Sequence, residues 1–133
     1  MDLITKEIAK YIDQLGKENN KNFGDFGSDI VTQVFTDEPT DQIAVRAGSG
    51  PTPPRDPTST PGIQILVRSK SPDVAERKIW EIHDLIDQEF NFWLTDYIFI
   101  YSILASNEPG SIGQDKKGNF LFSSNYNLRV KFY

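Results

Sequence analysis

The sequence contains no cysteine and only one histidine, His83, among its 133 residues. Without cysteine the chain has no disulfide, no thiolate nucleophile and no cysteine-ligated zinc site. Any catalytic or metal site that needs a histidine must therefore use His83. The sequence also lacks the roughly 18 to 20 consecutive apolar residues of a membrane-spanning helix, and its first residues lack the basic and apolar regions of a secretory signal. We therefore expect no membrane partner.

Basic residues are scarce as well. The chain has 14 Lys and Arg against 19 Asp and Glu, a net charge of −5. Binding to nucleic acid needs clustered Lys and Arg to contact phosphates, so this balance argues against a dedicated nucleic-acid-binding protein. The hydrophobic content of 38% and the charged content of 25% are ordinary for a globular protein. The length indicates one domain over residues 1–133.

The best-formed unit is a strand that leads into a long helix over residues 61–90. Apolar residues at 63, 65 and 67 alternate as in a strand with one buried face. Ser71 is a suitable helix N-cap, and Pro72 fits the first helical position. Apolar residues then recur at intervals of three and four, which predicts a buried helix face made of Ala75, Ile79, Ile82, Ile86 and Phe90.

The remaining segments complete a predicted α+β fold. A helix is expected over residues 2–16, ending at Gly16, and a polar loop over 17–28. Short strands are expected over 29–36 and 42–47, joined by a turn at 37–41 that contains Pro39. Two further strands are expected over 93–105 and 120–132, with a turn at 114–119. The order α-β-β-β-α-β-β predicts two helices packed on a mostly antiparallel sheet.

The segment 93–105 is apolar on both faces. Tyr97, Phe99 and Tyr101 fall on one face together with Ile103, while Ile98, Ile100 and Leu104 fall on the other. Such a strand is either buried in the centre of a sheet or covered by another subunit. Tyr97, Phe99 and Tyr101 are therefore candidate interface residues.

The segment 47–61 differs from the rest in composition. It holds five prolines, two glycines and five Ser or Thr in 15 residues, too few apolar side chains to offset the entropy of ordering it. One interpretation is an exposed, flexible hairpin loop. The other is an arm that orders against a partner, because loops of this length are often functional. On the second interpretation Pro53, Pro54 and Arg55 are candidate contacts.

The outer surface of the second helix carries two features. Trp80 lies about 140° from Ala75 around the helix, either as an interface anchor or as a core residue on a second packed face. Six carboxylates and two cations between residues 73 and 89 give this segment −4 of the chain's net −5. This surface is either an ordinary solvated face or a repulsive wall that faces another polyanion.

A catalytic constellation is not evident. His83 lies at the edge of the apolar stripe, where a partly buried structural histidine is the favoured interpretation over a ligand or general base. Asp84 and Asp87 lack the further oxygen ligands and central glycine of a calcium loop. The glycine pairs Gly24/Gly27 and Gly48/Gly50 lack the strand-to-helix context of a phosphate-binding loop. We therefore predict that the chain is not an enzyme and uses no metal or cofactor.

Four motifs, taken in order, resemble those of bacteriophage minor capsid and tail-terminator proteins. Residues 30–45 resemble their strand, Pro-x-Asp turn and strand, here Pro39-Thr40-Asp41. Residues 61–69 resemble their PG-x-Q strand, followed by a helix that opens near residues 73–75. The segment 108–118 resembles their closing P-x-x-(I/L)-G-x-D-x-x-G hairpin, and Asn125-Tyr126 resembles the N-(Y/F) pair of the last strand. The likeness covers nearly the whole chain.

The resemblance implies a structural virion protein of a long-tailed phage, assembled in the host cytoplasm. Such proteins form a ring, typically of six subunits, that caps the tail tube, ends its polymerisation and meets the head connector. DNA passes through the ring, and an acidic bore of Glu76, Glu81 and Asp84 would repel it. Two alternatives are another head–tail joining protein, such as a stopper or adaptor, and a small hydrolase that uses His83 with nearby carboxylates.

Overall fold

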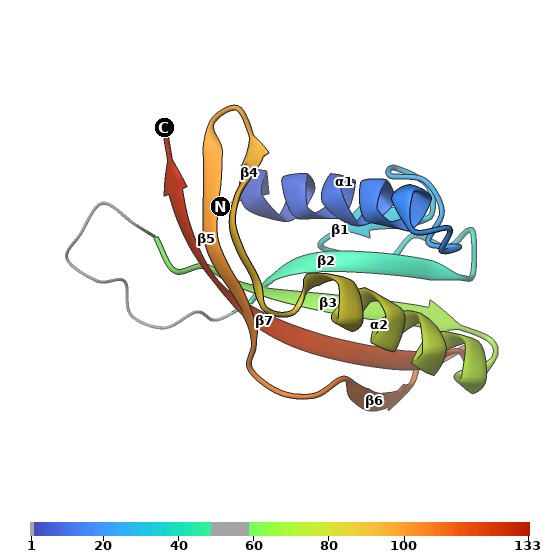
Figure 1. Ribbon diagram of the computed structural model, residues 1–133. Helices are drawn as coiled ribbons and strands as arrows, with labels where there is room; N and C mark the ends of the chain where they lie inside the picture. Colours follow the sequence, from blue (N-terminus) through green and yellow to red (C-terminus); the bar gives the residue numbers. More distant parts are fainter. Residues whose placement is uncertain (1, 49–58) are drawn as a thin grey trace.

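A computed structural model describes residues 2–48 and 59–133 of the chain (Figure 1). Within these residues, two helices and seven strands follow one another in the order α1, β1, β2, β3, α2, β4, β5, β6 and β7. Their bounds are α1 Asp2–Glu18, β1 Ile30–Thr32, β2 Gln42–Gly48, β3 Gly62–Ser69, α2 Pro72–Ile86, β4 Glu89–Thr95, β5 Ile98–Ala105, β6 Gly110–Gln114 and β7 Phe120–Phe132.

All seven strands form one curled sheet in the order β1-β2-β3-β7-β5-β4, with β6 also paired to β7. Among the strands of the described residues, only the β1–β2 pair is parallel. The longest strand, β7, pairs along one side with β3 and along the other with β6 and then β5. The predicted α+β fold, with two helices on a mostly antiparallel sheet, is confirmed; β4 and β6 are strands added to the predicted order.

Both helices pack on the same face of the sheet. Helix α1 contacts β1, β2 and β4, and α2 contacts β3 and β7. The main core lies between these layers and is rich in isoleucine. Its largest fully buried side chains are Tyr126, Ile4, Ile8, Ile12, Ile30, Ile43, Ile63, Ile65, Ile79, Ile82, Ile86 and Ile98. Since side chains alternate along a strand, the residues between these positions point to the opposite face, which the helices leave uncovered. We call this the open face.

Helix α2 begins as the sequence predicts. The hydroxyl of Ser71 accepts a hydrogen bond from the backbone N–H of Val74 at 3.4 Å, and Pro72 opens the helix. Four of the five predicted stripe residues, Ala75, Ile79, Ile82 and Ile86, are buried. The prediction for Phe90 is wrong, because the helix ends at Ile86 and Phe90 lies in β4 with 52% of its surface exposed.

Helix α1 passes the predicted stop at Gly16 and continues to Glu18. Gly16 serves packing instead of helix termination. A Cβ atom at this position would lie 2.7 Å from Cδ2 of Phe23, which is buried against the helix. The glycine therefore lets the ring of Phe23 close the end of the core. With 17 residues against 15, α1 is also longer than α2, contrary to the prediction of α2 as the long helix.

Two predicted strands have different bounds in the structure. The segment expected as one strand over 93–105 is the hairpin of β4 and β5, which turns at residues 96–97. An irregularity in the β5–β7 pairing between Ile100 and Ser102 also moves Ile103 into the core, away from the face predicted for it. The strand expected over 29–36 is confined to β1, and the chain then crosses the open face to reach β2.

The predicted turn at residues 114–119 connects β6 and β7. The Asp115 carboxylate accepts hydrogen bonds from the backbone N–H of Lys117 and from the backbone and side-chain amides of Asn119, at 2.9 to 3.0 Å. These bonds, the one from the Asn119 side chain foremost, hold the pKa of Asp115 below its ordinary value. Gly118 takes a φ of +82°, a conformation that favours glycine. Asp115 and Gly118, the Asp and the second Gly of the hairpin motif, thus have structural roles.

Candidate protein interface

The chain itself covers one end of the open face. There Val31, Ala44 and Leu66 form a second, smaller core beneath the ring of Phe35. Phe35 belongs to the connection 33–41 between β1 and β2. This connection lies over the sheet at this end and shields the side chains of Val31, Ala44 and Leu66 from water.

Arg68 of β3 holds the connection in place. Its guanidinium donates to the carbonyl oxygens of Thr36 at 2.6 Å, Pro39 at 3.0 Å and Thr40 at 2.8 Å. It also lies 4.7 Å from the centroid of the Phe35 ring, a cation–π distance. Arg68 is only 8% exposed, so its charge is satisfied almost entirely by groups of its own chain.

The other end of the open face is aromatic, and no segment of residues 2–48 or 59–133 covers it. Four rings from β4, β5 and the C-terminus contact one another there: Trp93 with Phe99 at 5.1 Å, Trp93 with Tyr133 at 5.2 Å, and Phe99 with Tyr101 at 5.0 Å between centroids. Trp93 is 56% exposed and Tyr133 is 63% exposed. We call Trp93, Phe99, Tyr101 and Tyr133 the aromatic patch.

Two cations of β7 border the aromatic patch. The Lys131 ammonium lies 4.7 Å from the Tyr133 ring centroid, and the Arg129 guanidinium lies 5.8 Å from that of Tyr101. Exposed Trp and Tyr beside Arg form the side-chain combination that is enriched at the energetic centres of protein interfaces. The arrangement therefore suits contact with another protein surface.

Sequence reasoning found only part of this surface. Phe99 and Tyr101 do lie together, as predicted, while Tyr97 lies in the hairpin turn, 68% exposed, and accepts a hydrogen bond from the Tyr133 backbone N–H at 2.7 Å. Trp93 and Tyr133 were missed. Trp93 stands at the start of the apolar segment 93–105, at an odd-numbered position like Phe99 and Tyr101, and this was a signal for it. Its partnership with Tyr133 depends on the pairing of β5 with β7.

The outer surface of α2 is the second notable surface. Trp80, 38% exposed, lies one helical turn from Glu76 and one from Asp84, both exposed. Glu81 forms ion pairs with Lys21 at 3.3 Å and with Arg77 at 3.9 Å. Of the three carboxylates predicted for a bore, Glu81 thus pairs with cations of its own chain. We call Glu76, Trp80 and Asp84 the acidic face of α2.

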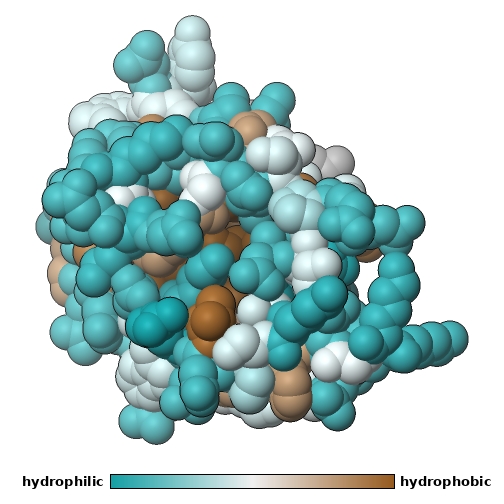
Figure 2. All heavy atoms as spheres, turned by 90° about the vertical axis from the view of Figure 1, so that its right-hand side faces the viewer, coloured by the Kyte–Doolittle hydropathy of each residue, from teal (hydrophilic) through white to brown (hydrophobic). Residues whose placement is uncertain are grey.

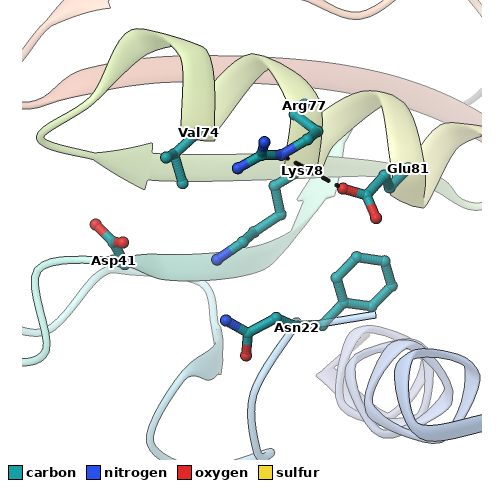
Figure 3. Close-up of a pocket in the computed structure, with 7 residues that line it drawn as sticks. Asn22, Asp41, Val74, Arg77, Lys78 and Glu81 are labelled. Atoms are coloured by element: carbon teal, nitrogen blue, oxygen red, sulfur yellow. Dashed lines mark ion pairs between the residues drawn. The ribbon is translucent and has the colours of Figure 1, made fainter. Parts of the chain in front are cut away.

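A small pocket lies beside the first turns of α2. Figure 2 shows this end of the molecule, where the surface is largely hydrophilic around an apolar hollow. Figure 3 shows Lys78 pointing into this pocket between Asp41 and Asn22, with Arg77 paired to Glu81 at its rim. The cavity volume is about 100 Å³. Ligand pockets usually span roughly 300 to 1,000 Å³, so this one does not fit a metabolite.

His83 is surrounded by structural contacts. Its Nδ1 lies 3.0 Å from the hydroxyl of the buried Tyr126, its Nε2 lies 3.6 Å from Asp87, and its ring meets the edge of Trp80 at 5.4 Å. Burial, together with the nearby Asp87 and Asp84 carboxylates, raises the pKa of Tyr126 above its ordinary value. Asp87 in turn accepts a hydrogen bond from the Ala105 backbone N–H at 2.8 Å, so the group ties α2 to β5 and β7.

Three further observations concern other kinds of site. Within residues 2–48 and 59–133, no three His, Asp or Glu side chains are placed to hold a metal ion. In that same part of the chain, no helix has the length and apolar character needed to cross a membrane. The predicted contacts Pro53, Pro54 and Arg55 lie outside the described residues. The described ends of the segment 47–61 belong to the sheet, because Ala47 and Gly48 end β2 and Ser59 bridges Val130.

Comparison with known proteins identifies one family. The model of a family described as bacteriophage tail terminator protein matches residues 19–132, which is most of the chain and includes every strand. No curated protein matches the chain.

Proposed function

This chain belongs to the bacteriophage tail terminator family, and on that premise we propose that it forms a ring that caps the finished tail tube. It is thus a structural protein of the phage tail, and its place is the virion. In the proposed role the ring ends tube polymerisation and offers a surface to the head connector. Its partners are further copies of itself, six in the proposed ring, the tube protein and a head-completion protein.

The observation that carries this proposal is the exposed aromatic patch. An isolated chain gains nothing from leaving Trp93 and Tyr133 more than half exposed, whereas a subunit that assembles can bury both rings against a neighbour. The placement of His83 supports the same conclusion. Its ring is used to connect α2 to Tyr126, which favours a structural role over the hydrolase considered from the sequence.

The acidic bore predicted from the sequence remains a proposal with fewer residues. Glu81 already pairs with Lys21 and Arg77, so Glu76 and Asp84 are the two predicted bore residues whose side chains are exposed. In a bore these two would repel the DNA that passes through it without specific binding. This placement excludes the subunit contact proposed below for the same residues, and the cross-linking experiment described there distinguishes the two.

Electron microscopy of particles made without this protein tests the proposed function. We expect overlong tails and heads without tails, and normal lengths when the chain is supplied from a plasmid. Tails of normal length attached to heads would contradict the proposal. Normal unattached tails together with heads that have lost their DNA would instead identify the alternative, a stopper or adaptor of the connector.

A further inference from the structure

We propose that neighbouring subunits join head to tail, with the acidic face of α2 of one copy on the aromatic patch of the next. This inference rests on the proposed ring and specifies its subunit contact. In this arrangement both surfaces contact another copy of the same chain.

A closed ring needs two different, complementary surfaces on each subunit, because a heterologous contact repeats around an axis. The two surfaces named here meet that requirement. Helix α2 lies on the face of the sheet that carries the core, whereas the aromatic patch lies on the open face, toward the β4–β5 turn and the C-terminus (Figure 1). They therefore point away from each other, and one copy cannot satisfy its own patch.

Charge is divided between these two sides of the molecule. Helix α2 presents Glu76 and Asp84 around Trp80. Among the described residues, the positions of β2, β3, β5 and β7 that point to the open face include no Asp or Glu, and the cations beside the aromatic patch are Arg129 and Lys131. Two copies with a net charge of −5 each repel one another overall. A contact between them is favoured where unlike charges meet, as acidic α2 and basic β7 allow.

The size of the patch is adequate for the centre of such a contact. Aromatic side chains bury about 150 to 250 Å² each when fully enclosed. The exposed Trp93 and Tyr133 of the patch, together with Phe90 of β4 and Tyr97 of the β4–β5 turn, which lie outside the patch as defined, thus offer roughly 500 Å² of the about 800 Å² per subunit that a stable interface needs. Polar residues around the patch can supply the remainder, and Trp80 of the neighbour is a suitable anchor.

The sheet edges are less suited to joining copies. Edge strand β1 has three residues, and edge strand β4 contains Asn91 at a φ of +55° and an irregular pairing near Thr95. Strand β6 is interrupted at Gly113, which has a φ of +106°. Short and bulged edges oppose strand-to-strand association, so a face contact is favoured over edge pairing.

Charge exchange tests the contact. The assay polymerises purified tube protein with the full-length chain and measures the chain concentration that halves the mean tube length. We expect Lys131→Glu alone, and Glu76→Lys with Asp84→Lys, each to raise that concentration at least about tenfold. Combining all three substitutions should return it to within about threefold of the unmodified chain, because opposite charges again face each other.

The matched control is Arg46→Glu, which reverses an exposed charge of the open face outside the patch and should leave the concentration unchanged. The proposal would be overturned if the combined variant needed as high a concentration to halve the tube length as the more impaired of its two parent variants. The unmodified chain separates this failure from failure of the proposed function. If it does not shorten tubes, the capping role itself is wrong; if it does and the exchange fails, only the subunit contact is wrong.

Engineered cysteines provide a second test, free of background because the chain has none. Asp84→Cys and Tyr97→Cys in one chain, treated with a bismaleimide on assembled tails, should give a ladder of cross-linked multimers. Tyr97→Cys alone should stay monomeric, and dimers from it would overturn the proposal in favour of patch-to-patch pairing. Capped tails without cross-linked multimers would also overturn it. That result would favour the predicted bore as the place of Glu76 and Asp84.

Discussion

The two ends of the open face use the same kind of contact under opposite conditions. At one end Arg68 lies 4.7 Å from the Phe35 ring, and at the other Lys131 lies 4.7 Å from the Tyr133 ring. Arg68 is 8% exposed because the connection 33–41 folds over it, whereas Tyr133 is 63% exposed. The two cation-to-ring distances are equal, and the two ends differ in whether a described segment of the chain covers the contact.

The covered end belongs to the stability of the subunit. The buried Arg68 donates to three carbonyl oxygens of the connection and so fixes it to β3, which is why its removal affects folding. At the uncovered end no segment of the described chain closes over the rings. We therefore expect changes there to spare folding and to impair assembly. Substitutions at the two ends test this division, and the largest effect is expected at Arg68.

Arg68→Met should lower the free energy of unfolding by about 3 kcal/mol, because carbonyl groups of the connection lose a charged donor. Urea unfolding followed by circular dichroism measures this loss. Arg46→Met, an exposed arginine on the same face, is the control and should change the value by less than about 0.5 kcal/mol. Equal effects of the two would remove the distinction between the ends.

Trp93→Ala should cost at least about 2 kcal/mol in assembly, the scale of an interface hot spot. In the tube-length assay this is roughly a thirtyfold higher concentration for capping. Unfolding in urea should change by about 1 kcal/mol or less, since the ring is already 56% exposed. If the variant capped tubes normally, the uncovered end would not be an interface.

His83→Ala should lower the free energy of unfolding by about 1 to 2 kcal/mol, because the buried Tyr126 hydroxyl loses its partner. Capping at a temperature where the variant is folded should be unchanged. Adding Tyr126→Phe removes the orphaned hydroxyl and should recover part of the stability. A folded His83→Ala protein that cannot cap tubes would place His83 in function and not only in the core.

The smallest expected effect is alkaline destabilisation through Tyr11, which stacks on Phe92 beneath α1. Burial, with smaller contributions from Glu89 and Glu18, raises the pKa of Tyr11 to about 12. The folded state thus favours the neutral phenol, and its stabilising contribution is complete below pH 10 and is lost as pH rises toward 12. Urea midpoints between pH 8 and 11 should fall less steeply for Tyr11→Phe than for the unmodified chain. Identical slopes would contradict this assignment.

Local pattern was enough to predict much of the fold. The cap at Ser71 and the isoleucine stripe of α2 depend on residues within a few positions of one another. The alternation of residues 63, 65 and 67 likewise predicted which side chains of β3 enter the core, as the burial of Ile63, Ile65 and Val67 confirms. The β4–β5 hairpin escaped prediction because its turn, Asp96-Tyr97, has no glycine, proline or asparagine to signal it.

The sequence by itself determined the two helices, the apolar face of the central strands, the acidic surface of α2 and the resemblance to tail terminators. Only the tertiary structure decided how the open face is used. Trp93 meets Tyr133 because β5 pairs with both β4 and β7, and Arg68 meets Phe35 because the connection 33–41 folds back over β3. Such partners are far apart along the chain, and strand order and register, not local periodicity, bring them together.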